Sequence, residues 1–174
     1  NMLMIIGQYD ADDVVSFFRK LEFMSLIDRF SERKQELEKK YHLVDDEEKF
    51  KQFIDKISQQ TFFAFDTETT DVDPMRAELV GLSFSWIAGE AYYIPVKGPE
   101  NASKEKRLLP PEKVLAALKP LLENECVKKC GHNAKYDILV LSQYGIEVKG
   151  LDFDTMVASY LINPSARQHN IDAV

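Results

Sequence analysis

The feature that most constrains this chain is the run Phe62–Thr69, which begins apolar and aromatic and ends in two carboxylates. The continuous apolar character of Phe62–Phe65 is typical of a β-strand buried on both faces. Successive side chains on a strand point to opposite faces, so Asp66 and Glu68 should share one face, with Cα atoms about 6.6–7 Å apart. Neighbouring buried carboxylates repel each other and are costly to desolvate. A divalent cation such as Mg²⁺ would offset that cost.

A second polar group lies further along the chain, at Asn133, Tyr136 and Asp137. Asn133 follows a predicted turn and is placed to cap a helix running from Ala134 to about Gln143. Asn133 and Asp137 are four residues apart and should share one helix face, where the helix dipole favours the Asp137 carboxylate. Asp137 could approach the strand carboxylates only if something positive lay between them.

Each of these patterns also has an ordinary structural interpretation. An Asp-x-Glu at a strand end is most often solvated, Asn133 could be a plain helix cap, and Tyr136 could be a core aromatic. Asp154 is predicted to be the N-cap of a helix from Thr155 to Ile162 rather than a metal ligand. His132 and His169 are interpreted as loop residues. Spacing alone therefore leaves the catalytic interpretation open.

The remaining pattern predicts an α/β fold with a mixed central sheet flanked by helices, after a helical N-terminal lead-in. Two short helices are expected between Asp12 and Lys40, ending in a charged, solvated linker from Ser31. Asp45 and Glu48 resemble a capping box that starts the next helix. The apolar face of that helix comprises Phe50, Phe53, Ile54 and Ile57.

Further strands are expected at Tyr41–Val44, Leu79–Trp86, Ala91–Val96 and Val127–Cys130. The hairpin turn Ala88–Glu90 makes part of the sheet antiparallel. A helix should open at the Pro110–Pro111 pair and be kinked or divided by Pro120.

Composition narrows the possible classes of protein. The 174 residues suit one compact domain. A net charge of −7 and a pI near 5.0 argue against a general electrostatic grip on nucleic acid, although metal ions could neutralise a local site. Two cysteines are too few for a disulfide framework, and no apolar run is long enough to span a bilayer. The sequence shows no Ser-His-Asp or Cys-His set and no phosphate-binding Gly-rich loop.

Several motifs occur in the order found in one nuclease family. From about Tyr41 to Asp172 the chain resembles the 3′–5′ exonuclease domain of bacterial DNA polymerase I, within the ribonuclease H-like superfamily. The motifs that carry the resemblance are Phe65–Thr69, Leu79–Phe84, Tyr93–Val96, Lys119–Leu122, Gly131–Asp137, Asp154–Met156 and Ser159–Tyr160.

The resemblance implies proofreading by two-metal hydrolysis of the 3′-terminal phosphodiester of single-stranded DNA, with Mg²⁺ or Mn²⁺ as cofactors. Asp66 would bridge both metals. Glu68 would bind the metal that activates water and contact the 3′ end, and Asp137 would hold the metal on the leaving-group side. The residues implied in substrate binding are Thr67, Val72, Asn133 and Tyr136. Two ions about 3.5–4 Å apart suit an in-line displacement.

The resemblance also implies a domain organisation. Residues 1–40 would be a helical segment connecting to a 5′ nuclease domain, and residues 41–174 an exonuclease domain that stops before the family's third motif, Tyr-x-x-x-Asp. The family has Arg directly before the histidine matching His169, whereas here the order is Arg167-Gln168-His169. We therefore expect residues 1–174 alone to be weakly active or inactive. The parent chain would carry a polymerase domain and act in DNA replication and repair, in the bacterial cytoplasm with the nucleoid and without a membrane.

Three alternatives remain at this point. A freestanding exonuclease of the ribonuclease D or Werner type would prefer RNA 3′ ends. A catalytically silent ribonuclease H-like module would only bind DNA or brace a polymerase, although it would have no need for three carboxylates. A carboxylate pair of the glycosidase kind would act without divalent metal.

Overall fold

The computed structural model describes residues 11–21, 23, 27, 38–98 and 108–171. The chain divides into two compact units, residues 1–38 and 39–174. In the first unit the helix α1 spans Ala11–Lys20, as the periodicity predicts. The second expected helix falls mostly outside the described residues. Helical structure does not extend to Lys40, because Glu38 and Lys39 are not helical and Lys40 opens a strand.

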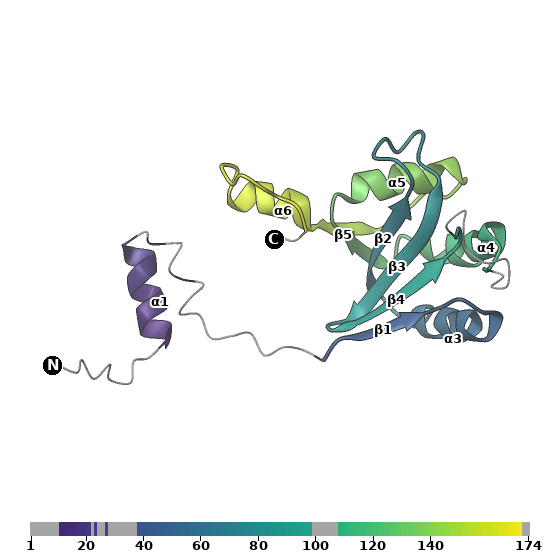
Figure 1. The fold of residues 1–174 in the computed structure, drawn as a ribbon, viewed down its shortest axis with the longest axis horizontal. Helices are drawn as coiled ribbons and strands as arrows, with labels where there is room; N and C mark the ends of the chain where they lie inside the picture. Colours follow the sequence, from purple (N-terminus) through teal and green to yellow (C-terminus); the bar gives the residue numbers. More distant parts are fainter. Residues whose placement is uncertain (1–10, 22, 24–26, 28–37, 99–107, 172–174) are drawn as a thin grey trace. The chain divides into compact units, whose positions relative to one another are not determined.

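The second unit is built on a mixed sheet (Figure 1). Its described strands are β1 (Lys40–Leu43), β2 (Phe62–Thr69), β3 (Leu79–Ile87), β4 (Glu90–Pro95), β5 (Lys128–Gly131) and β6 (Leu151–Asp154). They lie in the order β1-β4-β3-β2-β5-β6. The β2–β3 and β3–β4 pairs are antiparallel, whereas β1–β4, β2–β5 and β5–β6 are parallel. The mixed α/β sheet is confirmed, with β6 as a strand that the sequence pattern did not reveal.

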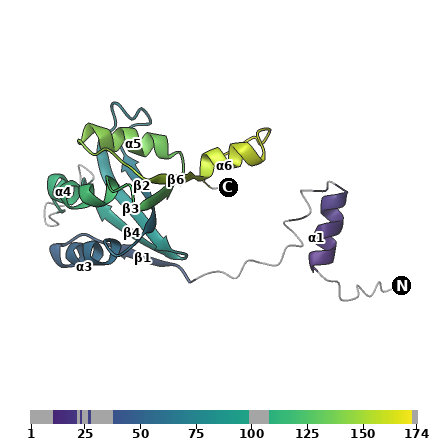
Figure 2. The same ribbon diagram turned by 180° about the vertical axis from the view of Figure 1, so that it is seen from behind.

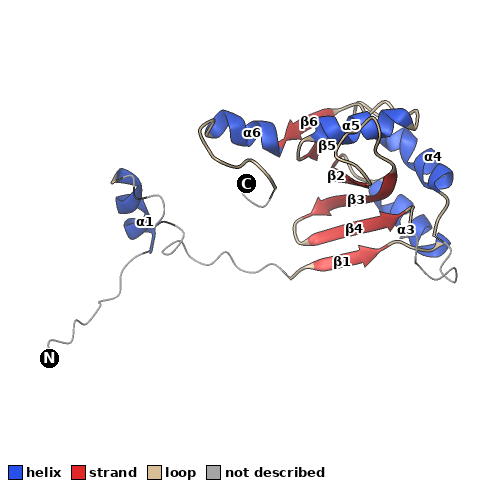
Figure 3. Cartoon of the chain, turned by 45° about the horizontal axis from the view of Figure 1, so that its top comes forward, coloured by secondary structure: helices blue, strands red, loops and turns tan. Residues whose placement is uncertain are grey.

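Four helices accompany the described sheet: α3 (Glu47–Ile57), α4 (Pro111–Leu122), α5 (Ala134–Gln143) and α6 (Thr155–Ile162). Helices α3, α4 and α5 bury apolar side chains in one core with β2, β3 and β4. Figures 2 and 3 show α6 beyond the end of β6, away from these three helices, and α6 contributes no buried residue. No helix within the described residues is long and apolar enough to cross a membrane.

Strand β2 is buried on one face rather than on both. Phe63, Phe65 and Thr67 alternate into the interior, whereas Phe62 on the opposite face is 46% exposed. The continuous apolar run suggested burial on both sides, but the apolar core contains Phe63 and Phe65 and leaves Phe62 outside. The alternation places Asp66 and Glu68 on the less covered face of the strand.

One predicted helix boundary needs correction, at the start of α3. The N-cap of α3 is Asp46, whose carboxylate accepts the Lys49 N–H at 2.8 Å, and Asp45 instead accepts a hydrogen bond from Lys49 Nζ at 2.6 Å. The apolar face of α3 is as predicted. Pro120 does not divide α4, which continues to Leu122. Pro120 lies in the last turn, so only Leu121 and Leu122 follow it in the helix.

Candidate active site

The candidate site lies at the carboxyl end of β2, in the middle of the sheet. Asp66 is opposite Ser83 and Glu68 is opposite Gly81 in the antiparallel pairing with β3. Thr67 faces the other way and is only 7% exposed. The predicted sharing of one face by Asp66 and Glu68 therefore follows directly from the strand's alternation.

The charge on Asp66 is strongly disfavoured. Burial is the largest cause, and together with the nearby carboxylates of Asp137 and Glu68 it raises the pKa of Asp66 to about 6. A like charge close to a carboxylate favours its protonated form. Asp137 and Glu68 therefore both lie near enough to Asp66 to disfavour its charge.

Asp137 reaches β2 through hydrogen bonds and not through an intervening positive group. The backbone N–H of Thr67 donates to Asp137 Oδ1 at 2.8 Å, and the Thr67 hydroxyl donates to the same oxygen at 2.6 Å. Asp137 is 2% exposed. Burial raises the pKa of Asp137, while both bonds from Thr67 act to lower it. Asp137 therefore contacts β2 through Thr67, whose two donors the sequence pattern did not reveal.

The turn before α5 is held by Asp154 and not by the Asn133 side chain. Asn133 is the N-cap residue of α5, as predicted, but it has left-handed φ and ψ angles of 59° and 41°, and its side chain makes no capping bond. Asparagine is among the residues that tolerate this conformation. The Asp154 carboxylate instead accepts the N–H groups of Asn133 at 3.1 Å and Ala134 at 2.8 Å.

The same carboxylate caps α6, as predicted. Asp154 Oδ1 accepts the N–H groups of Met156 at 2.9 Å and Val157 at 3.2 Å. These backbone bonds lower the pKa of Asp154 although burial alone would raise it. One side chain therefore fixes the beginnings of two helices, one of which carries Asp137.

Tyr136 ties α5 to the loop that follows β2. Its hydroxyl shares a hydrogen bond with Thr69 Oγ1 at 2.5 Å and donates to the carbonyl of Asp71. Its ring is partly buried against the core. Val72, the next residue in the loop, is 92% exposed. The structure thus places Tyr136 beside the loop that presents Val72 to solvent.

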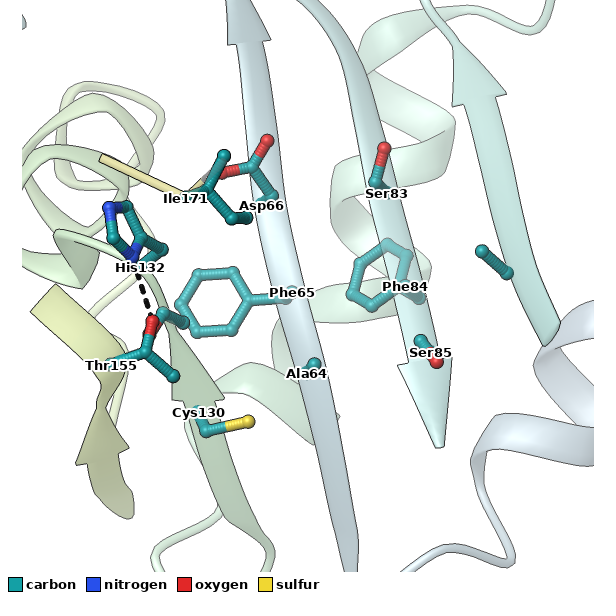
Figure 4. A pocket seen from close by; sticks show the side chains of 12 residues that line it. Ala64, Phe65, Asp66, Ser83, Phe84, Ser85, Cys130, His132, Thr155 and Ile171 are labelled. Carbon is teal, nitrogen blue, oxygen red and sulfur yellow. Dashed lines mark hydrogen bonds between the residues drawn. The ribbon is translucent and has the colours of Figure 1, made fainter. Parts of the chain in front are cut away.

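A pocket of about 250 Å³ opens beside Asp66 on the less covered face of the sheet (Figure 4). Small side chains from four strands border it, namely Ala64 of β2, Ser83 of β3, Ala91 of β4 and Cys130 of β5. His132 also lines the pocket, and its Nδ1 lies 2.8 Å from Thr155 Oγ1. His132 thus fixes the start of α6.

His169, the other predicted loop histidine, lies against the helix α6. Its Nδ1 is 2.8 Å from Ser159 Oγ, and its ring stacks on Tyr160 with centroids 3.7 Å apart. His169 is buried, at 8% exposed. These contacts give His169 a packing role within the C-terminal described segment.

The carboxylate oxygens near Asp66 are suitable ligands for a hard divalent cation, although they do not form a complete metal site by themselves. Within the described ranges, no three His, Cys, Asp or Glu side chains are arranged as a group that could hold a metal by themselves. The carboxylates nevertheless concentrate negative charge at Asp66, and carboxylate oxygens are preferred ligands of Mg²⁺. Mg²⁺ usually completes its coordination with water and substrate phosphate oxygens, so such a site need not be closed by protein ligands.

Comparison with known proteins identifies relatives. A family model described as 3′–5′ exonuclease matches residues 41–173. DNA polymerase I of Pseudomonas aeruginosa is 34% identical over 97% of this chain and 20% of its own length. DNA polymerase I of Chloroflexus aurantiacus is 38% identical over 63% of this chain and 11% of its own length. The chain thus spans a fifth or less of these curated relatives.

Solved structures share the fold. The POL domain of Pol1 from M. smegmatis, in complex with DNA primer-template and dNTP, has a TM-score of 0.56 at 22% identity, covering 75% of this chain and 21% of that one. Brucella melitensis NrnC with bound Mg²⁺ has a TM-score of 0.52 at 22% identity, covering 79% and 59%. Trypanosoma brucei RNase D has a TM-score of 0.52 at 19% identity, covering 66% and 37%.

These structures confirm the predicted ribonuclease H-like exonuclease fold. The family match extends over most of the chain, and the curated relatives quoted above are bacterial polymerases. The chain belongs to the 3′–5′ exonuclease domain family of bacterial DNA polymerase I.

Proposed function

We propose that this chain is a proofreading domain that hydrolyses the 3′-terminal phosphodiester of single-stranded DNA. The observation that carries this proposal is the link between Asp137 and Thr67, the residue between Asp66 and Glu68. That link holds Asp137 of α5 against the end of β2 that carries Asp66 and Glu68. The M. smegmatis neighbour, whose structure contains DNA primer-template, supports a DNA substrate.

The proposed cofactors are two divalent ions, Mg²⁺ or Mn²⁺. When bound, the ions would supply an activated water nucleophile and stabilise the charge that develops on the leaving oxygen. Asp66 would contact both ions, Glu68 the ion on the water side, and Asp137 the ion on the leaving-group side. The raised pKa of Asp66 supports this assignment, because burial and the neighbouring carboxylates of Asp137 and Glu68 disfavour the charge of Asp66 until a cation binds. The Mg²⁺ bound to NrnC is consistent with it.

The terminal nucleotides would be seated by residues around the loop after β2. Val72 is 92% exposed and free to pack against a base, and Tyr136 fixes that loop through Asp71. Asn133 holds its left-handed turn at the start of α5, with its side chain making no capping bond. We propose that Asn133 and Tyr136 bind the substrate strand. The net charge of −7 means that this grip would be local and dependent on the metals.

The wider context is part of the same proposal. Residues 1–40 would connect this domain to a 5′ nuclease domain, and a polymerase domain would belong to the same polypeptide in the bacterial cytoplasm. The family's third motif would lie beyond Val174. Residues 1–174 by themselves would then hydrolyse DNA weakly or not at all, because groups that act as a unit lose activity together.

An exonuclease that prefers RNA is the second candidate. The similarity in fold to T. brucei RNase D motivates it. The carboxylate arrangement would serve either substrate, since both reactions displace an oxygen from phosphorus with the same metals. Discrimination would come from contacts with the sugar, because the 2′-hydroxyl distinguishes RNA from DNA.

The test uses end-labelled DNA and RNA single strands of one sequence. A polypeptide extended through the third motif should release mononucleotides from the DNA 3′ end with Mg²⁺, and residues 1–174 should release few or none. Asp66→Ala in the extended polypeptide is the matched control and should be inactive. Faster RNA cleavage would favour the RNA candidate. Inactivity of the extended polypeptide with both Mg²⁺ and Mn²⁺ would favour a silent module.

A further inference from the structure

Thr67 lies between the two strand carboxylates but points to the opposite face of β2. Both of its donors end on one atom: the backbone N–H lies 2.8 Å and the hydroxyl 2.6 Å from Asp137 Oδ1. Thr67 is 7% exposed and Asp137 is 2% exposed. Bonds to an ionised acceptor are stronger than neutral ones, so this pair is a firm connection between β2 and α5.

The topology explains why the Thr67 N–H is available to a side chain. Strand β2 pairs with β5 only over Phe62–Ala64, and β5 ends at Gly131. The chain then turns through Asn133 into α5. Beyond that point β2 has no β5 residue beside it, and Asp137 takes the bond that a strand partner would otherwise accept. A buried N–H without a partner would be costly.

These two bonds also determine which part of Asp137 can bind a cation. Oδ1 accepts both Thr67 donors, so Oδ2 carries neither bond. A carboxylate held at one oxygen by two donors cannot rotate without losing both. Oδ2 therefore has a fixed direction, and the two bonds hold Asp137 against the residue that directly follows Asp66 in β2.

We propose that Thr67 is a positioning residue, which holds Asp137 Oδ1 and aims Oδ2 at the cation shared with Asp66. This inference rests on the proposed function and deepens it. In this arrangement Asp66 and Glu68 lie on one face of β2, and Thr67 orients the third ligand, Asp137, from the other face. In place of the nucleotide contact that the resemblance implied, the Thr67 hydroxyl acts through Asp137.

The test is Mn²⁺ binding to residues 1–174, followed through the electron paramagnetic resonance signal of free Mn²⁺. Thr67→Val keeps the shape and the backbone N–H but removes the hydroxyl, and it should weaken Mn²⁺ binding by about 10–100-fold, as loss of a partner of a metal ligand does. Thr67→Ser restores the hydroxyl and should bind Mn²⁺ like the unaltered chain. Thr70→Val is the matched control, because the Thr70 hydroxyl accepts the Glu78 N–H at 3.0 Å; it should not change binding.

The outcomes separate this inference from the proposed function. Unchanged Mn²⁺ affinity in Thr67→Val, or weakened affinity in Thr67→Ser, would overturn the positioning role. Absence of Mn²⁺ binding by the unaltered chain, or binding that survives Asp66→Ala, would overturn the metal site itself and this inference with it. The melting temperature of each metal-free variant reports its folding. If Thr67→Val does not fold, the Mn²⁺ affinities of Thr67→Ala and Thr67→Ser are compared instead, because these two variants also differ in the hydroxyl.

Discussion

At the scale of single residues, the carboxylates of the site differ in how far hydrogen bonds offset the free-energy cost of burying their charge. Asp66 lies beside two like charges in a partly buried position, and its pKa rises to about 6. Asp137 is more deeply buried yet accepts two hydrogen bonds from Thr67. In the metal-free protein, the cost of burying charge is therefore offset less at Asp66 than at Asp137. Asp137 has a structural role as well as its proposed role as a metal ligand.

The first prediction concerns Asp66 and pH. A folded-state pKa of about 6, against 3.8 for the unfolded chain, corresponds to a stability difference of at most about 3 kcal/mol. Because the folded pKa is raised, the stability that Asp66 contributes is present below about pH 4 and is lost as pH rises through about 6. Asp66→Asn should therefore stabilise the metal-free protein at pH 7.5.

Urea unfolding of both proteins, with a chelator present, measures this effect. The stability difference should shrink as the pH is lowered and vanish below about pH 4, where the aspartate is protonated in both states. Equal stability at pH 7.5 would mean that Asp66 is not destabilised by its neighbours.

The second prediction separates the two roles of Asp137. Asp137→Ala leaves the buried Thr67 N–H and hydroxyl without their acceptor and should cost about 1–3 kcal/mol or more. Asp137→Asn keeps a carbonyl oxygen that can accept both bonds and should cost much less. Denaturant titration of the two variants gives the comparison. An Asn variant as unstable as the Ala variant would show that the negative charge itself stabilises the fold.

At the scale of elements, the site depends on where α5 begins. Asp154 accepts two N–H groups at the start of α5 and two at the start of α6. Asp46 has the same role for α3 alone, where it accepts the Lys49 N–H. Removing an N-cap lowers the free energy of unfolding by a similar amount in different helices. The loss of stability on removing each carboxylate should therefore depend on how many helices it caps.

The third prediction uses this pair of caps. Asp46→Ala should destabilise the protein by about 1 kcal/mol, and Asp154→Ala by about 2 kcal/mol or more, because it removes two caps. Unfolding free energies from urea titration test the ratio. A cost for Asp154→Ala no greater than that for Asp46→Ala would mean that the α5 contacts of Asp154 contribute little.

At the scale of the whole molecule, local patterns predicted most elements, and contacts distant in sequence account for the missed strand β6 and for the absent capping bond of Asn133. Helix α5 has its predicted residues because its periodicity and its stop near Gly145 are local signals. Asn133 occupies the predicted N-cap position, but the capping bond of its side chain is absent, and the carboxylate at the start of α5 comes from Asp154, 21 residues later. Strand β6 was missed because its apolar pattern is short and it pairs only with β5 in the described sheet.

In the candidate site, too, local sequence patterns predicted some features, and contacts between distant residues determine the others. The common face of Asp66 and Glu68 follows from strand alternation alone. The hydrogen bonds from Thr67 to Asp137 join residues 70 positions apart and depend on where β5 stops. The one-sided burial of β2 depends on which helices cover the sheet, which composition does not encode.

The central claim is that Asp66, Glu68 and Asp137 form one divalent-metal site. The most direct measurement is anomalous X-ray scattering from Mn²⁺ in crystals of this chain grown with Mn²⁺, with Asp66→Ala crystals as the control. The account predicts an anomalous peak between Asp66 and Oδ2 of Asp137 that is absent from the control. A peak elsewhere only, or one that persists in the control, would contradict it.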